Sequence, residues 1–298
     1  MMNCTELRRV TCRPASPQDT ADVLELTKTI WEGHDYIPRV WQDWLSDTEG
    51  LLIVAEYGGR VVGISKLSRL APDEWWLEGL RVHPMYQGKG IAAHLHDYLL
   101  DYWQRKAGGV IRLATASFNS KVHQMCERRG FRKVLEVSSF VSSQFSEERV
   151  GSVSPLWTVV HNDEISIALN VTHRSPLLAL YGGLMDLDWQ WGKVTLNRLA
   201  EAIQERRAWW WRDRQGLLIQ RLDEEEGTLF PLIQLVACPF EAIADCLRDF
   251  KSFALSQGYQ RVRWFAPLHP ELNKAMEVAG FQRDWEDSLY IFEKQQEG

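Results

Sequence analysis

Two glycines that follow a His-Pro pair carry the clearest chemical signal in the chain. An apolar run ends at Val82, and the segment Gln87-Gly88-Lys89-Gly90 then leads into a strongly periodic, helix-forming stretch. Free N–H groups converge at the start of a helix, and the helix dipole favours negative charge there. Paired glycines let the backbone approach a phosphate closely. The pattern therefore predicts an anion site at the N-terminus of a helix.

The spacing of this loop excludes two common phosphate-binding motifs. It does not match G-x-x-x-x-G-K-[ST] of nucleoside triphosphatases, nor G-x-G-x-x-G with a later acidic residue, as in dinucleotide-binding folds. A bare G-x-G also occurs at ordinary strand–turn–helix junctions, where glycine serves only the sharp turn. The whole context from Leu80 to Ala93, with its His-Pro stop, favours a cofactor loop instead.

A regular order of strands and helices positions the loop. Ser16 and Pro17 begin a helix as N-cap and first residue, and Asp19 completes a capping box. Gly58-Gly59 joins two β-rich runs as a hairpin. Strands are predicted at 10–14, 51–56, 60–67, 74–82, 110–114 and 131–141, and helices after Ser16, over 41–45, after the loop and over 119–129. The resulting order is β-α-α-β-β-β-α-β-α-β.

This order of elements resembles that of the GCN5-related N-acetyltransferase (GNAT) superfamily over residues 8–145. The glycine loop adds to the resemblance, because a strand is followed by His-Pro, then by [Gln/Arg]-Gly-x-Gly-x-Ala and then by a helix. The resemblance implies an α/β fold with a mixed sheet and a catalytic GNAT domain at residues 1–145. It also implies acetyl-CoA as co-substrate, without a metal, its pantetheine arm against the strand at 74–82 and its pyrophosphate on the glycine loop. The residues expected to hold it are Leu80, Arg81, Val82, Gln87, Gly88, Lys89, Gly90, Ile91, Ala92 and Asn119.

Acetyl transfer from a thioester needs a neutral amine, a donor for the developing oxyanion and stabilisation of the leaving thiolate. The resemblance implies an oxyanion donor among the backbone N–H groups of Leu80–Val82. Glu78 is the predicted base, because strand alternation places it on one face with Trp76 and Leu80. Partial burial among tryptophans would raise its pKa. Two alternatives stay open: Glu78 pairs with an arginine or holds the acceptor's ammonium, and Glu74 is a weaker candidate base.

The proton donor for the thiolate departs from the family pattern. GNAT proteins often carry Asn-x-x-Ala-x-x-x-Tyr-x-x-x-Gly-Phe, in which the tyrosine is the general acid. Asn119 and Gly130-Phe131 fit this pattern, but Cys126 stands at the tyrosine position. A cysteine thiol can donate a proton, although a buried cysteine more often only packs. Tyr36, His123 and water are the other candidates, and Asn119 is equally suited to capping its helix.

The acceptor is expected to meet the break between the first two helices, at residues 31–38. This break and the segment Leu77–Val82 resemble the histidine N-acetyltransferase-like proteins. That resemblance implies a free amino acid or small amine, acetylated on its α-amine, with an arginine such as Arg81 on the acceptor carboxylate. The predicted substrate-binding residues are Asp35, Tyr36, Trp41 and Trp76.

Two other functions are compatible with the sequence. One keeps the enzyme class but changes the acceptor to a protein N-terminus or a lysine side chain, which requires an open groove. The other is a binding module that senses acetyl-CoA without transfer. The missing tyrosine supports a sensor, whereas an intact Glu78 argues against it.

Composition limits the class of protein and its partners. The chain has 298 residues, which suggests two domains, and a formal net charge of −6. No Lys/Arg run and no apolar run of membrane-spanning length occur, so neither nucleic acid nor a membrane is an expected partner. Residues 1–9 lack the apolar core of a signal peptide, and five scattered cysteines suggest a reducing cytoplasm. We expect a small-molecule amine as partner, and a monomer or homodimer.

The second half of the chain repeats the first in weakened form. A polar, Ser-rich segment at 144–155 marks the boundary, and a second domain is predicted at 155–298. When the sequence is aligned with itself at an offset of 150 residues, four positions are identical: Ala116, Glu127, Gly130 and Phe131 align with Ala266, Glu277, Gly280 and Phe281. The segment Ala237–Glu241 replaces the glycine loop, and its Pro239 lacks a donor N–H. We therefore expect a degenerate GNAT-like domain without its own cofactor loop; an unrelated α+β domain is the alternative.

Overall fold

The chain packs into two units, each of which is built from more than one segment of the sequence. The computed structural model describes residues 10–28, 30–106, 108–143 and 156–296. Unit 1 comprises Met1–Ala114, Lys121–Arg132 and Phe292–Gly298, and unit 2 comprises Thr115–Ser120 and Lys133–Ile291. The predicted boundary segment at 144–155 lies outside the described residues.

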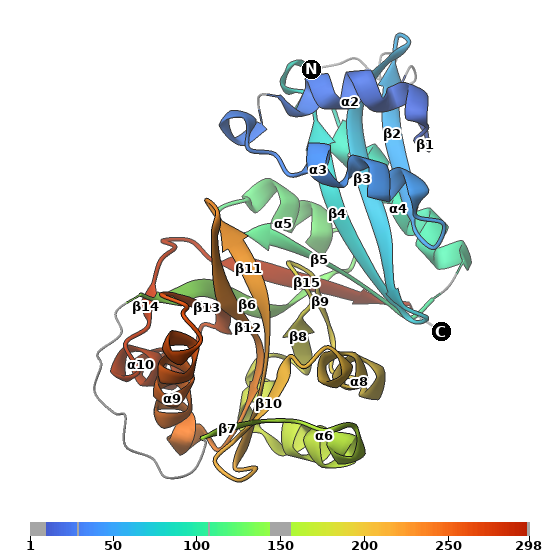
Figure 1. The fold of residues 1–298 in the computed structure, drawn as a ribbon. Coiled ribbons are helices and arrows are strands. Elements are labelled where there is room, and N and C mark those ends of the chain that lie inside the picture. The colour runs from blue at the N-terminus through green and yellow to red at the C-terminus, as the bar shows by residue number, and fades with distance from the viewer. Residues whose placement is uncertain (1–9, 29, 107, 144–155, 297–298) are drawn as a thin grey trace. The chain divides into compact units, whose positions relative to one another are not determined.

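Unit 1 is built on a sheet in the order β1-β2-β3-β4-β5, antiparallel except for the parallel pair β4–β5 (Figure 1). Its elements are β1 (Val10–Pro14), α2 (Thr20–Thr27), α3 (Ile37–Ser46), β2 (Leu51–Tyr57), β3 (Arg60–Ala71), β4 (Glu74–Val82), α4 (Ile91–Lys106), β5 (Val110–Ala116) and α5 (Ser120–Glu127). This order confirms the predicted fold of the first half.

Local signals in the sequence explain several of these boundaries. The Asp19 carboxylate accepts a hydrogen bond from the Ser16 backbone N–H at 2.8 Å and pairs with Arg13, so the predicted capping box forms. Gly58 and Gly59 have φ of +59° and +78°, as a tight hairpin turn requires. Pro38, which we placed at the end of the break between the first two helices, lies in the first turn of α3, because proline fits that position without losing a hydrogen bond.

Helices cover both faces of the unit 1 sheet (Figure 1). On one face, α2 and α3 bury a cluster that includes Val23, Ile37 and Trp41 against β2 and β3. On the other face α4 comes so close that a Cβ on Gly63 would lie 3.0 Å from Leu95 Cδ1. Strand β3, which pairs with β4, is therefore packed on both faces.

Unit 2 repeats this architecture. Its sheet runs β6-β13-β12-β11-β10-β7, with β12 and β13 parallel, so β7, β10, β11, β12 and β13 correspond in order to β1 to β5. The elements are β6 (Arg132–Ser142), β7 (Trp157–Val159), α6 (Ile165–Arg174), α7 (Pro176–Leu180), β8 (Leu184–Asp186), β9 (Trp191–Lys193), α8 (Leu196–Gln204), β10 (Ala208–Trp211), β11 (Gly216–Glu225), β12 (Thr228–Ala237), α9 (Ile243–Ser256), β13 (Val262–Pro267), α10 (Pro270–Val278), β14 (Gln282–Arg283) and β15 (Leu289–Gln295). The prediction of a second GNAT-like domain is confirmed.

The last residues of the chain return to unit 1. Arg112, wholly buried in β5, donates from Nε to Glu293 Oε2 at 2.7 Å, and the Gln296 N–H donates to the Gly109 carbonyl at 3.0 Å.

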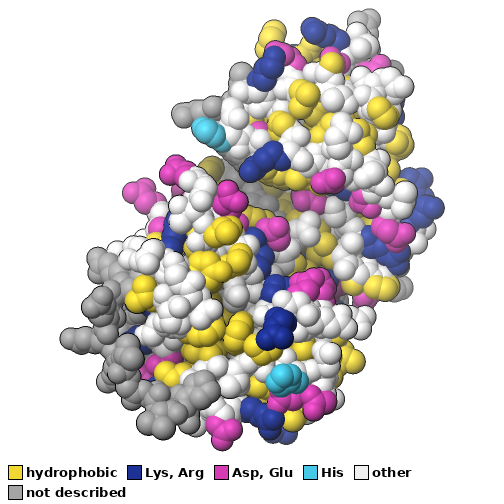
Figure 2. Space-filling model, in the orientation of Figure 1, with side chains coloured by type: hydrophobic (Ala, Val, Ile, Leu, Met, Phe, Trp, Pro, Cys, Tyr) yellow, Lys and Arg dark blue, Asp and Glu magenta, His cyan; other side chains and the backbone are white. Residues whose placement is uncertain are grey.

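On the face drawn in Figure 2, basic and acidic side chains are interspersed over each unit, with hydrophobic side chains between them. Within the described residues, no helix has both the length and the apolar character needed to span a membrane.

Candidate functional site

A bulge in β4 is the centre of the candidate site. Glu78 pairs with Lys66 of β3, but Arg81 pairs with Ile64, so Gly79 and Leu80 together oppose one residue. Gly79 has φ of +65°, and a Cβ there would lie 2.5 Å from the Trp44 ring. Glycine is thus required twice, for the backbone conformation and for the close approach of α3.

The bulge changes which side chains share a face with Glu78. We expected simple alternation to align Trp76, Glu78 and Leu80. The alignment of Trp76 with Glu78 holds, but the extra residue shifts the register, and Arg81 replaces Leu80 on that side of the strand. The expectation for Leu80 was therefore wrong, since a period of two does not survive an inserted residue.

Arg81 and Asp35 form a shielded ion pair beside the bulge. The guanidinium donates from Nε to Asp35 Oδ2 at 3.0 Å and from Nη2 to Oδ1 at 3.2 Å, with side-chain exposures of 14% and 1%. Asp35 Oδ1 also accepts from the Ile37 N–H at the start of α3. Two predicted site residues thus bind each other, which fixes the break between the helices against β4.

Tyr36 lies over this ion pair and reaches the bulge. Its ring centroid is 5.5 Å from Arg81 Cζ, and its ring packs edge-on against Trp44 at 6.0 Å. Burial, and then the nearby negative charge of Glu78, raise the pKa of Tyr36 to about 12, although a hydrogen bond from the Gly79 backbone opposes this shift. The phenol therefore stays protonated over the whole neutral and mildly alkaline range.

Glu78 is half-buried on β4 and held by a neighbouring hydroxyl. Ser68 Oγ on β3 donates to Glu78 Oε1 at 2.5 Å, and Ser65 Oγ donates to the Glu78 carbonyl at 3.4 Å. The carboxylate is therefore oriented from one side. Ser68 is a site residue that the sequence did not reveal, because it belongs to no motif and acts only through a long-range contact. Trp44 belongs to the Trp-Leu-x-Asp segment behind the helix break, but it was not among the predicted substrate-binding residues.

Two predicted acceptor residues lie in the core of unit 1. Trp41 is 1% exposed, belongs to the cluster under α2 and α3, and donates from Nε1 to Thr20 Oγ1 at 3.0 Å. Trp76 is 2% exposed on β4. Both rings pack the wall behind the site, whereas Tyr36 and Trp44 lie directly at the bulge.

The glycine loop has the geometry of an open anion cradle. Gly88 and Gly90 have φ of +73° and +82°, and a Cβ on Gly88 would meet no atom within 4 Å. Gln87 Nε2 donates to the Val82 carbonyl at 3.1 Å, which ties the loop to β4, and Lys89 Nζ lies 5.2 Å from the Tyr86 ring centroid. The 16-residue helix α4 begins directly afterwards, so its first free N–H groups face the loop.

Strands β4 and β5 are registered only at the end of β4 away from the bulge. Their register within the described residues covers only three pairs, from Glu74–Val110 to Trp76–Arg112. The C-terminal part of β4, which includes Leu80, Arg81 and Val82, therefore runs on without a registered partner on β5. An extended arm could pair with this edge, as predicted for pantetheine.

Cys126 is buried in unit 1. It is 0% exposed, its carbonyl accepts the Phe131 N–H, and burial raises the pKa of its thiol to about 12. This environment is that of a packing cysteine. Asn119 precedes α5 in a turn closed by its N–H and the Ala116 carbonyl, and the His123 ring stacks near Phe292 at 5.6 Å.

Comparisons of sequence agree with this geometry. The model of the acetyltransferase (GNAT) family matches residues 19–131. An N-alpha-acetyltransferase RimI from Mycobacterium tuberculosis is 30% identical over 129 residues, which are 42% of this chain and 80% of that protein. A histidine N-acetyltransferase from Oreochromis niloticus is 34% identical over 82 residues, 27% of this chain and 24% of that protein. The chain thus spans about a quarter of the length of that histidine enzyme.

Solved structures match the whole chain in fold. A GCN5-related N-acetyltransferase from Sphaerobacter thermophilus superposes with a TM-score of 0.65 at 13% identity, over 96% of each chain. A tandem GNAT protein from the clavulanic acid biosynthesis pathway superposes with a TM-score of 0.59 at 13% identity, over 96% of this chain and 98% of that one. The likeness is one of fold, and it extends across both units.

Proposed function

The chain belongs to the GNAT family of acetyltransferases, and from this premise we propose that it acetylates the α-amine of a free amino acid or a similar small amine. The observation that carries the proposal is the grouping of Asp35, Tyr36, Glu78 and Arg81 around the β4 bulge. This grouping offers a carboxylate and a phenol at the place where an amine would meet a thioester.

Acetyl-CoA supplies the activated acetyl group when it is bound. The residues present fit it, because Gly88 leaves the loop open, α4 directs free N–H groups toward the loop, and β4 continues past Trp76–Arg112, the last pair of its described register with β5. We propose that Gln87 to Ala92 hold its pyrophosphate and that the backbone of Leu80 to Val82 holds its arm. The bulged backbone at Leu80 is suited to donate a hydrogen bond to the acetyl oxygen.

Glu78 serves as the base in this proposal. A lysine-like amine needs about 4 kcal/mol to become neutral near pH 7.4, whereas an α-amine, with an ordinary pKa of about 7.7–8.0, needs less than about 1 kcal/mol. Either amine must still lose a proton as it is acetylated, and a carboxylate can accept that proton. The hydrogen bond from Ser68 to Glu78 Oε1 orients the carboxylate on β4. From this half-buried position the carboxylate can reach the amine directly or through one water.

Tyr36 is the proposed hydrogen-bond donor to the leaving sulfur. It is a neutral phenol at assay pH, it is fixed by Trp44 and the Gly79 backbone, and it lies near Glu78. Cys126, by contrast, has no exposed surface and a raised pKa. We therefore assign the donor role to Tyr36 and packing to Cys126.

A protein N-terminus is the second candidate acceptor. It is favoured by the likeness to an N-alpha-acetyltransferase, which covers 80% of that protein. Both acceptors carry an α-amine, so the same base would serve either. Arg81 is already paired with Asp35, and a free amino acid would therefore need another cation for its carboxylate.

The test is an assay of free thiol release from acetyl-CoA against amino acids, polyamines and short peptides. We expect turnover with one or more free amino acids and a Tyr36→Phe variant that loses kcat while keeping its affinity for coenzyme. Turnover only with peptides would favour the second acceptor. Tight coenzyme binding without turnover on any amine would instead support a sensor and overturn the proposal.

A further inference from the structure

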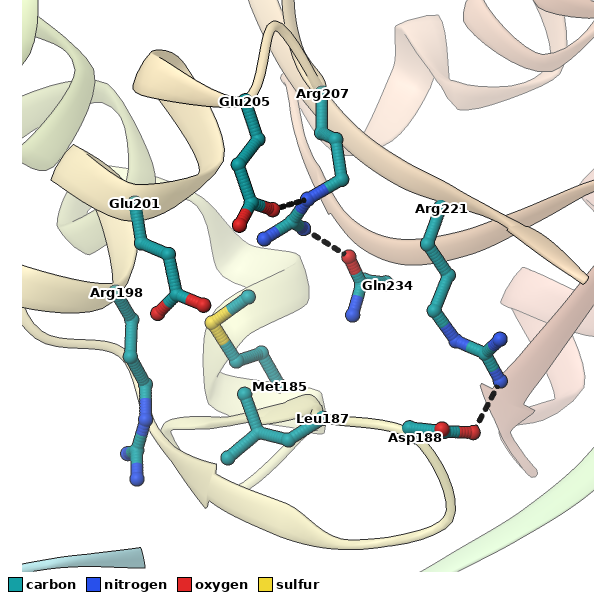
Figure 3. Close-up of a pocket in the computed structure, with 9 residues that line it drawn as sticks. All are labelled: Met185, Leu187, Asp188, Arg198, Glu201, Glu205, Arg207, Arg221 and Gln234. Atoms are coloured by element: carbon teal, nitrogen blue, oxygen red, sulfur yellow. Dashed lines mark hydrogen bonds and ion pairs between the residues drawn. The ribbon is translucent and has the colours of Figure 1, made fainter.

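Unit 2 contains a polar pocket that the acetyl-transfer chemistry of unit 1 does not use. The pocket has a volume of about 350 Å³, which is in the range of small-molecule sites. It lies between the β8–β9 hairpin, α8 and the strands β11 and β12 (Figure 3). The lining residues are Met185, Leu187, Asp188, Arg198, Glu201, Glu205, Arg207, Arg221 and Gln234.

The pocket occupies the place that corresponds to the candidate acceptor site of unit 1. Ile219 pairs with Leu235 and Gln220 pairs with Ile233, so Gln234 is an extra residue in β12. This bulge is in the strand that corresponds to β4, and α8 precedes β10 as α3 precedes β2. Unit 2 therefore keeps a bulged strand beside a cavity, although Cys238-Pro239 replaces the glycine loop.

Two partly buried arginines of this pocket are held by fixed partners. Arg207 donates from Nη1 to Gln234 Oε1 and from Nε to Glu205 Oε2, both at 2.6 Å, and Gln234 Nε2 donates to the Asp186 carbonyl at 2.9 Å. Arg221 donates from Nη2 to Asp188 Oδ1 at 2.6 Å, and its Nη1 lies 3.4 Å from Asp223 Oδ1. Among the described residues, its buried Nε has no hydrogen-bond partner. An unpaired buried donor is unfavourable, and a ligand oxygen would satisfy it.

Two of the carboxylates that pair with these arginines are more exposed than the arginines themselves. The side chains of Arg207 and Arg221 are 23% and 17% exposed, whereas those of Glu205 and Asp188 are 54% and 64% exposed. Glu201 enters from the side opposite to Arg221, and Met185 and Leu187 provide an apolar wall (Figure 3). The pocket thus offers partly buried cations, more exposed carboxylates at its rim and apolar surface for a short side chain.

We propose that this pocket binds a small zwitterion of the amino-acid class and does not acetylate it. The carboxylate of the ligand meets Arg207 and Arg221, because a guanidinium fork matches a carboxylate. Its ammonium meets Glu201 and Glu205 at the rim. No transfer follows, because Pro239 lacks an N–H and the segment Ala237–Glu241 has no glycine to receive a pyrophosphate.

Calorimetric titration of the full chain with the standard L-amino acids tests this proposal. At least one amino acid should bind saturably, and its carboxamide and its des-amino analogue should each bind at least about tenfold more weakly. Arg221→Gln should weaken binding by a similar factor. Arg248→Gln removes an exposed ion pair with Asp245 in the same unit and should leave the affinity unchanged.

Turnover in unit 1 is measured in the same proteins, so the two proposals can fail separately. Arg221→Gln should keep wild-type acetyl transfer, which also shows that the variant is folded; Glu201→Gln provides a second, milder variant for the ammonium contact. Binding that depends on Arg221 would stand even if no amine were acetylated. Binding of equal strength in wild type and Arg221→Gln, equal binding of the carboxamide, or no saturable binding would overturn the inference.

Discussion

Replacing Gly79 by alanine should destabilise unit 1 by about 2–5 kcal/mol. About 1–2 kcal/mol of this arises because an L-residue is strained at the observed φ of +65°. A further 1–3 kcal/mol or so arises from overpacking, since the new Cβ would lie 2.5 Å from the Trp44 ring. The bulge would shift to relieve the contact, so acetyl transfer should fall together with stability.

Two further variants separate these contributions. Gly59 has φ of +78° with no atom within 4 Å of an added Cβ, so Gly59→Ala should show only the conformational part. Trp44→Ala in the Gly79→Ala background should recover the steric part, which appears as a favourable coupling of about 1–3 kcal/mol in a double-mutant cycle.

Urea denaturation followed by hydrogen exchange in β3 and β4 measures the effect on unit 1 alone. Such a local probe is needed because a two-unit chain need not unfold in one step. A Gly79→Ala protein as stable as Gly59→Ala would refute the close approach of Trp44. Additive effects of Gly79→Ala and Trp44→Ala would refute it as well.

Three other predictions concern buried groups. Burial raises the pKa of Asp186 to about 7, so folded unit 2 keeps a proton that the unfolded chain loses. The stability of unit 2 should therefore fall by about 4 kcal/mol as pH rises from about 4 to 7. Denaturation of Asp186→Asn at a series of pH values should no longer show this dependence. Burial lowers the pKa of His96 to about 4, so unit 1 should lose about 3 kcal/mol as pH falls from about 6.5 to 4; an equal loss in His96→Gln would contradict this. Cys126→Ala should keep kcat within about twofold of wild type while lowering the stability of unit 1 by roughly 1 kcal/mol. A loss of kcat of about a hundredfold would instead show that the thiol takes part in the reaction.

Local patterns were enough to predict the frame of the site. The glycine loop, the capping box at Ser16 and the Gly58-Gly59 turn are contained in a few adjacent residues, and their structures follow from glycine, proline and capping chemistry. The repeat in the second half was also visible, because its helices and strands keep the spacing of the first half.

What the sequence did not reveal depends on pairings between distant residues. The β4 bulge depends on the register between β4 and β3, and the pattern of apolar and polar residues within 74–82 does not predict it. Asp35 and Arg81 are 46 residues apart, and Arg112 and Glu293 are 181 apart. The unit 2 pocket likewise draws Arg207, Arg221 and Gln234 from different strands and loops, so their shared chemistry emerges only from the fold.

The proposed base is tested most directly by kcat/KM of Glu78→Gln with the best amine found in the panel. The account predicts a fall of about 10²–10⁴-fold, with unchanged affinity for acetyl-CoA and a partial rise in rate at high pH, where the amine is neutral without help. Glu49→Gln, which removes only an exposed ion pair with Arg69, is the matched control and should retain wild-type activity. Wild-type kcat/KM in Glu78→Gln would contradict the account.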